Sequence, residues 1–169
     1  MPSPVPPSRS SRIEEARIRA AYAKRQKDDA RYSYFSMGNL FIIQEREQRL
    51  LTLLKRHDLV PLNTKKILEV GCGTGYWLRE FIKWGAWPEN ITGIDLLVDR
   101  IAEARYLCPE AVSILHGNAA ELAFPDATFD LVVQFTGPYC AKLCARNWPE
   151  AAPSPAGFDA RRGAAHETP

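Results

Sequence analysis

Long apolar runs are missing from this chain of 169 residues. None approaches the roughly 20 residues that a membrane-spanning helix requires. Residues 1–7 have neither the charged start nor the apolar segment of a secretory signal. The chain also lacks a strong excess of either charge, since its formal net charge is only +2. We therefore expect a cytoplasmic protein with neither a membrane nor nucleic acid as a partner, and its oligomeric state stays open.

Cysteine is too sparse to build a metal centre. The chain has four cysteines, of which Cys140 and Cys144 are separated by three residues. No second pair of Cys or His lies near them to complete a tetrahedral site. We expect no metal ion and interpret the thiols as structural. A convincing general base is missing as well, so the sequence predicts no catalytic residue.

The apolar content is sufficient for a core. Hydrophobic residues make up 46% of the chain and charged residues 25%, which suits one globular domain rather than two. Residues 1–11 contain four prolines and are expected to form an arm with little structure. Ser11 and Glu14 match a capping box, which predicts a basic helix to about residue 30. Asn39 is a candidate N-cap for a second helix, in which leucines recur at helical spacing.

A glycine-rich turn stands at the centre of the sequence. Residues 67–78 read as an apolar strand, a turn and an amphipathic helix, which is typical of a first βα unit whose turn holds a ligand. Gly71, Gly73 and Gly75 allow positive φ angles, and we expect them to bring backbone N–H groups close to a bound molecule. Dinucleotide-binding turns read Gly-x-Gly-x-x-Gly, whereas this turn reads Glu-x-Gly-x-Gly-x-Gly from Glu69. The difference disfavours a pyrophosphate ligand.

The residues after the turn continue the alternation of helices and strands. Ile91 to Asp95 predict a second strand that ends in a carboxylate, twenty residues beyond Gly75. A fourth strand is expected to pair on the far side of the first and to create a topological switch point. The predicted fold class is therefore α/β, with an incomplete doubly wound parallel sheet and N-terminal helices. The other expected elements are helices over Tyr76–Trp84 and Asp99–Leu107 and strands over Val112–Leu115 and Leu131–Phe135.

These features resemble a known family. Glu69 to Gly75 resemble the first motif of class I S-adenosylmethionine-dependent methyltransferases, and residues 67–135 as a whole look like the type 11 branch of that family. The resemblance implies a Rossmann-like sheet, S-adenosylmethionine as the cofactor and methyl transfer as the activity. It also implies that the helix N-terminus near Gly75 faces the methionyl carboxylate of the cofactor.

The resemblance also implies a set of cofactor contacts. Asp95 fits the acidic residue that accepts hydrogen bonds from the ribose hydroxyls, and it can also cap the following helix. Asn118 and the backbone of Ala119 are implied to lie against the adenine, where many relatives carry Asp at the first position. Tyr22, Tyr32 and Tyr34 are expected to form either part of a lid over the cofactor or packing between two helices. The implied cofactor-binding residues are Glu69, Gly71, Cys72, Gly73, Gly75, Asp95, Leu96, Asn118, Ala119 and Gln134.

The family pattern stops after the fourth strand. Residues 136–169 are rich in proline, glycine and alanine, and we expect them to be irregular and unrelated to the domain. The chain then divides into an arm with a basic helix (1–30), a cofactor-binding half-domain (31–136) and a tail (137–169). A chain truncated in this way leaves the fourth strand as an exposed edge, which favours aggregation.

Two functions stay open. The first is methyl transfer from S-adenosylmethionine to an acceptor that the sequence does not identify, with a small molecule or a glycan favoured. The second is a non-catalytic remnant that binds the cofactor weakly or not at all. A nicotinamide-dependent oxidoreductase is disfavoured by the glycine spacing.

Overall fold

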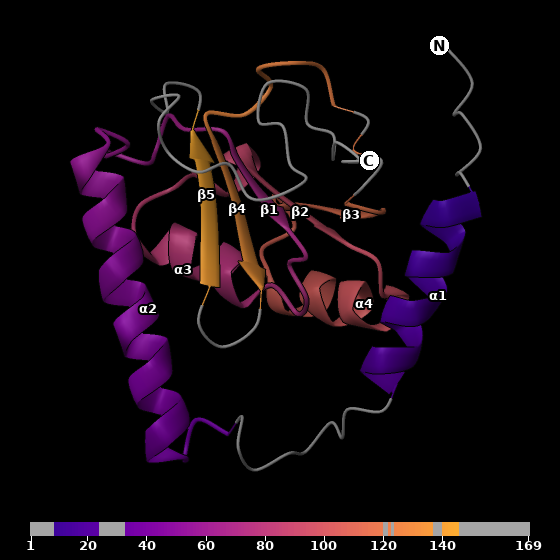
Figure 1. The fold of residues 1–169 in the computed structure, drawn as a ribbon. Coiled ribbons are helices and arrows are strands. Elements are labelled where there is room, and N and C mark those ends of the chain that lie inside the picture. Colours follow the sequence, from indigo (N-terminus) through magenta and orange to yellow (C-terminus); the bar gives the residue numbers. More distant parts are fainter. Residues whose placement is uncertain (1–8, 24–32, 120–121, 123, 137–139, 146–169) are drawn as a thin grey trace. The chain divides into compact units, whose positions relative to one another are not determined.

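The computed structural model describes residues 9–23, 33–119, 122, 124–136 and 140–145 (Figure 1). The chain divides into two compact units, residues 1–40 and residues 41–169. The domain limits that the sequence suggests at residues 30 and 136 stay predictions. Tyr32 and the expected end of the first helix lie outside the described residues. Within the described part of the chain, no helix combines the length and the apolar character needed to cross a membrane.

Both N-cap predictions for the N-terminal helices were wrong. Helix α1 spans Arg9–Ala23, so Ser11 lies inside the helix rather than at its N-cap. Helix α2 spans Met37–Arg56, and Asn39 is its third residue. The Asn39 side chain instead donates a hydrogen bond from Nδ2 to the carbonyl oxygen of Ser33 at 3.2 Å. It therefore joins the helix to the turn that precedes it.

The described residues of the second unit form five strands: β1 (Ile67–Val70), β2 (Ile91–Asp95), β3 (Ser113–His116), β4 (Leu131–Thr136) and β5 (Cys140–Ala145). They form one sheet in the order β3-β2-β1-β4-β5 (Figure 1). The first four strands pair in parallel, and β5 pairs antiparallel with β4. Because β2 and β4 flank β1 on opposite sides, the topological switch point lies beside β1, as predicted. The α/β class with a parallel sheet is confirmed.

The predicted exposed edge at β4 is wrong. Strand β5 pairs along the whole of β4, from the pair Leu131 and Ala145 to the pair Thr136 and Cys140. The expected irregular tail therefore contains a strand, and the rest of that tail lies outside the described residues. Alanine and lysine are weak strand formers, so the sequence of β5 carries little sign of its structure.

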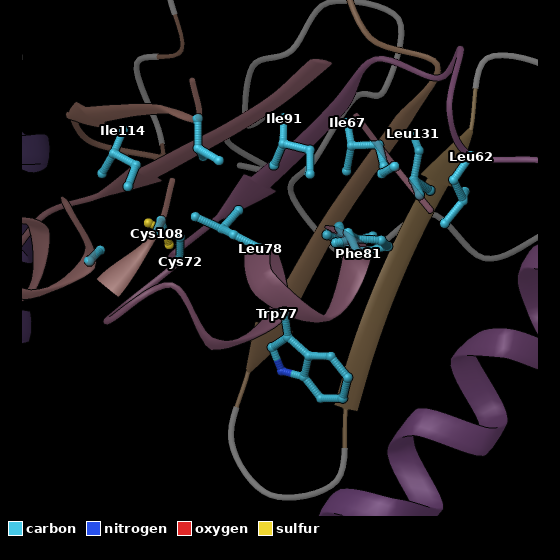
Figure 2. Close-up of a cluster of buried hydrophobic side chains, with 14 of the residues drawn as sticks. Leu62, Ile67, Cys72, Trp77, Leu78, Phe81, Ile91, Cys108, Ile114 and Leu131 are labelled. Atoms are coloured by element: carbon cyan, nitrogen blue, oxygen red, sulfur yellow. The ribbon is translucent and has the colours of Figure 1, made fainter. Parts of the chain in front are cut away.

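One face of the sheet is covered by two helices, α3 (Tyr76–Lys83) and α4 (Val98–Leu107), with the short 3-10 helix η2 (Pro88–Asn90) between them in the chain. Leu78 and Phe81 of α3 belong to the main hydrophobic cluster. The Trp77 ring stacks on Phe135 of β4, with ring centroids 4.3 Å apart. Figure 2 shows side chains from the four parallel strands in the main hydrophobic cluster, which are Ile114, Ile91, Ile67 and Leu131.

Strand β1 is buried on both faces. Leu68 and Val70 pack on the opposite face of the sheet, in a smaller cluster that includes Leu122. Such two-sided burial explains the continuous apolar run in this strand. Side chains alternate along a strand, so Glu69 points in the same direction as Ile67, toward α3. The sequence thus places a carboxyl group inside the core.

The packing of Phe81, the largest fully buried side chain among the described residues, predicts the effect of truncating it. Phe81→Ala should lower the free energy of unfolding by about 3–5 kcal/mol, since Phe81 is fully buried between α3 and the sheet. Urea denaturation measures the loss. Tyr106→Ala is the control, because Tyr106 is 88% exposed and its loss should change stability by less than about 0.5 kcal/mol. Equal losses for the two variants would contradict this packing.

Candidate functional site

The carboxyl ends of β1, β2 and β4 meet at one edge of the sheet. Val70, the last residue of β1, pairs with Ile94 on one side and with Gln134 on the other. Asp95, the last residue of β2, pairs with His116, the last residue of β3. The predicted site residues that end or follow the parallel strands are therefore brought to the same edge, as the switch-point topology requires.

The glycine turn has the predicted backbone conformation. The φ angles are +75° at Gly71, +55° at Gly73 and +75° at Gly75, all in the left-handed region that favours glycine. The two outer glycines have different surroundings. A Cβ at Gly71 would meet no atom within 4 Å, whereas a Cβ at Gly75 would lie 2.6 Å from Cys108 Sγ. The turn is thus open at its first glycine and tightly packed at its last.

The expectation that the turn brings its N–H groups close to a bound molecule stays a prediction, and four of these groups donate within the protein. The N–H groups of Gly71 and Cys72 donate to the carbonyl oxygen of Ile94, at 2.7 Å and 3.1 Å. The N–H of Gly73 donates to Asp95 Oδ2 at 2.8 Å. The N–H of Gly75 donates to the carbonyl oxygen of Cys72 at 2.9 Å. The first three of these bonds hold the turn against the end of β2, and the bond from Gly75 lies within the turn.

Glu69 lies beneath the turn and is only 1% exposed. Its carboxyl group accepts a hydrogen bond from the backbone N–H of Leu78, the third residue of α3. That N–H lies in the first turn of α3 and has no acceptor within the helix. The N-cap residue, Gly75, has no side chain that could accept from it, so Glu69 of β1 accepts instead. The second carboxyl oxygen, Oε2, is buried without a hydrogen-bond partner.

The surroundings of Glu69 favour its neutral form. Burial raises the pKa of the Glu69 carboxyl well above its usual range, and the nearby Asp95 carboxylate raises it further. The charge of Arg79 and the N–H of Leu78 act in the opposite direction. Desolvation is the largest of these effects, as expected for a carboxyl group inside a hydrophobic core.

Asp95 joins the turn to the start of α4. Its Oδ2 accepts from Gly73, and its Oδ1 accepts from the N–H of Leu97 at 2.9 Å. The prediction that Asp95 is the N-cap of this helix was wrong, because the N-cap residue of α4 is Leu97 and no side chain caps the helix. Asp95 instead accepts from the N–H of the N-cap residue itself. The carbonyl oxygen of Leu96 forms a hydrogen bond with His116 Nε2 at 3.2 Å, which ties the end of β2 to β3.

The remaining predicted residues lie around this edge. Asn118 and Ala119 follow β3 and are half-buried, and Ala119 packs against the smaller hydrophobic cluster. Gln134 of β4 lies beside Val70 and is also half-buried. Cys72 is buried inside the turn, and burial raises the pKa of its thiol. The contacts of these residues with a cofactor stay predictions.

Two residues beside the turn were missed at the level of sequence. Arg79 Nη1 donates to the carbonyl oxygen of Thr74 at 2.9 Å, and it also contacts Cys108 Sγ at 3.8 Å. Cys108 Sγ donates to the carbonyl oxygen of Gly75 at 3.7 Å. Arg79 lies one helical turn after Gly75, so its place beside the turn could have been predicted from the sequence. Cys108 is 33 residues beyond Gly75 and has no signal in the sequence.

The edge of the sheet presents acceptors rather than metal ligands. Among the described residues, no group of three or more His, Cys, Asp or Glu side chains is arranged to hold a metal ion. Each carboxylate oxygen of Asp95 accepts one backbone N–H and retains a second lone pair. The space beside Gly71 is open. This arrangement suits a ligand that carries hydroxyl donors and positive charge.

The comparisons with known proteins agree on one family. Residues 67–152 match the family described as a methyltransferase domain. A probable S-adenosylmethionine-dependent methyltransferase of Mycolicibacterium smegmatis is 41% identical over 87 residues, which cover 48% of this chain and 32% of the relative.

Two further relatives match a similar length of sequence. A malonyl-[acyl-carrier protein] O-methyltransferase of Bacteroides thetaiotaomicron is 35% identical over 83 residues, covering 46% of this chain and 29% of the relative. A demethylmenaquinone methyltransferase of Bacillus licheniformis is 39% identical over 67 residues, covering 38% and 29%. The chain therefore matches less than a third of the length of each of these relatives.

The packing of the turn predicts that alanine costs different amounts of stability at two glycines, Gly71 and Gly75, that have the same φ. Gly71→Ala should cost about 1–2 kcal/mol of stability, because its left-handed backbone becomes strained. Gly75→Ala should cost about 1–3 kcal/mol more, because the new methyl group meets Cys108 Sγ. Chemical denaturation measures both losses. In a Cys108→Ala background the extra cost of Gly75→Ala should shrink, and an undiminished cost would contradict the contact.

The burial of Glu69 predicts a pH-dependent stability. The folded protein keeps a proton on Glu69 that the unfolded chain loses at its ordinary pKa near 4.5. Stability therefore falls as pH rises from that value through the raised folded pKa. Glu69→Gln stays neutral, and its Oε1 can still accept from Leu78. The stability of this variant should therefore not show the decrease with rising pH that Glu69 causes. Urea denaturation from about pH 4 to about pH 9 measures it.

Glu110→Gln is the control for this experiment, because Glu110 is exposed. It should keep the pH dependence of the parent protein. If Glu69→Gln kept the same dependence, the proton would not be on Glu69.

Proposed function

The chain belongs to the class I S-adenosylmethionine-dependent methyltransferases, whose methyltransferase domain its residues 67–152 match. From this premise we propose that the protein binds S-adenosylmethionine at the carboxyl ends of β1 and β2 and transfers its methyl group to a small molecule or a glycan. The family and the named relatives indicate S-adenosylmethionine as the cofactor. The transfer reaction and its acceptor are our proposal, because the chain matches only part of each relative's length.

One observation carries the proposal. The middle of the glycine turn and the carboxylate that ends β2 are in direct contact, with 2.8 Å between Gly73 N and Asp95 Oδ2. A ligand that spans the two strand ends can therefore touch both at once. In open parallel sheets, ligands bind at this edge, next to the switch point.

The residues present fit this cofactor. Asp95 retains acceptor capacity for two ribose hydroxyls after its bonds to Gly73 and Leu97 are counted. The Asn118 side chain has both a donor and an acceptor for an adenine edge. The Asp95 carboxylate lies beside the turn, and a cationic ligand is favoured next to it, whereas the buried Glu69 is neutral. The open space beside Gly71 leaves room for the ligand's approach.

The chemistry of the reaction requires orientation more than acid or base catalysis. The bound cofactor would supply a methyl group on a positively charged sulfur, which is reactive without further activation. The work of the protein is then to align the acceptor atom with the methyl group and to keep both in place, which can lower the barrier by several kcal/mol, roughly 7–11 in favourable intramolecular cases. The turn is suited to this work because its backbone is fixed by four internal hydrogen bonds.

The acceptor is not selected by the matched segment. The relatives from Bacteroides thetaiotaomicron and Bacillus licheniformis are named for different acceptors, yet both match this chain over a similar length. A small molecule or a glycan is favoured here because the net charge of +2 offers no strong attraction for a polyanion such as nucleic acid.

Isothermal titration calorimetry tests the proposal. S-adenosylhomocysteine should bind to the purified chain, and NADH should not. Asn118→Ala should weaken binding by roughly fivefold, the equivalent of one lost hydrogen bond of about 1 kcal/mol. Asp126→Ala, in an exposed loop, should leave the affinity unchanged.

Transfer itself is measured with S-adenosylmethionine that carries a tritiated methyl group, by following tritium into candidate acceptors. Binding without transfer to any small molecule or glycan would limit the chain to cofactor binding. Absence of binding to S-adenosylhomocysteine would refute the proposed function.

A further inference from the structure

Three consecutive N–H groups of the glycine turn are held by the end of β2. Gly71 and Cys72 donate to the Ile94 carbonyl oxygen, at 2.7 Å and 3.1 Å. Gly73 donates to the Asp95 carboxylate at 2.8 Å. The first two bonds involve only backbone atoms, so they do not depend on the Ile94 side chain. The third bond depends on the Asp95 side chain.

The second oxygen of the same carboxylate is engaged locally. Asp95 Oδ1 accepts from the N–H of Leu97, two residues further along the chain, at 2.9 Å. The bonds from Gly73 and Leu97 together orient the carboxylate, because each of its two oxygens accepts one of them. The side chain of Asp95 is therefore fixed before a ligand arrives, and it fixes Gly73 in turn.

The conformation of Gly73 needs such support. Its φ of +55° lies in the left-handed region, and glycine has the greatest backbone freedom of any residue. A glycine without a fixed neighbour samples many conformations, and ordering it on binding costs conformational entropy. A hydrogen bond to a carboxylate is stronger than one between neutral groups, so it is well suited to limit this freedom.

We infer that Asp95 is a positioning residue for the glycine turn, which its carboxylate holds in the binding-competent conformation independently of any contact with the cofactor ribose. This inference rests on the proposed function for the identity of the ligand. Its distinguishing consequence is that loss of the carboxylate weakens binding even of a cofactor analogue without ribose hydroxyls.

The first test needs no ligand. Gly73 and Leu97 donate to different oxygens of Asp95, and Asp95→Asn replaces one of these oxygens by an NH2 group that only donates, so one of the two bonds is lost. Asp95→Ser retains an acceptor for the nearby Leu97 N–H, as in local Ser turns, but it is too short for Gly73. Amide exchange measured by NMR should accelerate about tenfold or more at Gly73 in Asp95→Ser. The amides of Gly71 and Cys72 are internal controls and should change much less.

The second test uses S-adenosylhomocysteine and its 2′,3′-dideoxy analogue with each variant, by calorimetry. If Asp95 only contacted the ribose, Asp95→Ser would weaken the first ligand and leave the analogue unaffected. A positioning role predicts that the analogue also loses about tenfold or more in affinity. Asp126→Asn, an exposed aspartate, is the matched control and should change neither affinity.

The outcomes separate the two proposals. Unchanged exchange at Gly73, or an unchanged affinity for the dideoxy analogue, would overturn the positioning role while the proposed function stands. If the unaltered chain bound neither ligand, the proposed function would fail, and amide exchange at Gly73 would still decide whether Asp95 holds the turn. Both variants are compared at a temperature where near-ultraviolet circular dichroism shows them folded.

Discussion

The attachment of the glycine turn to the end of β2 is the interaction on which the rest of the site depends. Backbone bonds from Gly71 and Cys72 reach Ile94, and the Gly73 bond reaches the Asp95 carboxylate. The turn ends at Gly75, which is also the N-cap of α3. The same attachment therefore sets where α3 begins and how that helix meets the sheet. The same hydrogen bonds therefore fix both the proposed binding edge and the helix that packs on the core.

The two acidic residues near the turn have different tasks because their surroundings differ. Asp95 accepts hydrogen bonds from two backbone N–H groups and is half-buried at the edge of the sheet. Glu69 is enclosed by the core, where burial raises the pKa of its carboxyl and favours the neutral form. A second full charge next to Asp95 would be repelled and poorly solvated. The structure thus places one carboxylate at the carboxyl edge of the sheet and uses the other carboxyl group as a buried helix cap.

Sequence reasoning succeeded where a residue type has a single structural use. Glycines at alternate positions after an apolar strand predict a left-handed turn, and an aspartate that ends the second strand predicts a carboxylate at the carboxyl edge of the sheet. It failed where long-range partners decide the outcome. The partners of the Gly71 and Cys72 N–H groups lie on another strand, and Cys108 reaches Gly75 from the end of α4. The pairing of β5 depends on β4 rather than on its own weak propensity.

The burial of Cys72 makes the reactivity of its thiol a measure of how often the turn opens. Its side chain is only 4% exposed, and burial raises the pKa of the thiol. Alkylating reagents attack the exposed thiolate, so they have almost no access to this sulfur while the native contacts persist. Modification must wait until the turn separates from β2. The rate at which Cys72 is alkylated therefore reflects how often that separation occurs, without any label added to the chain.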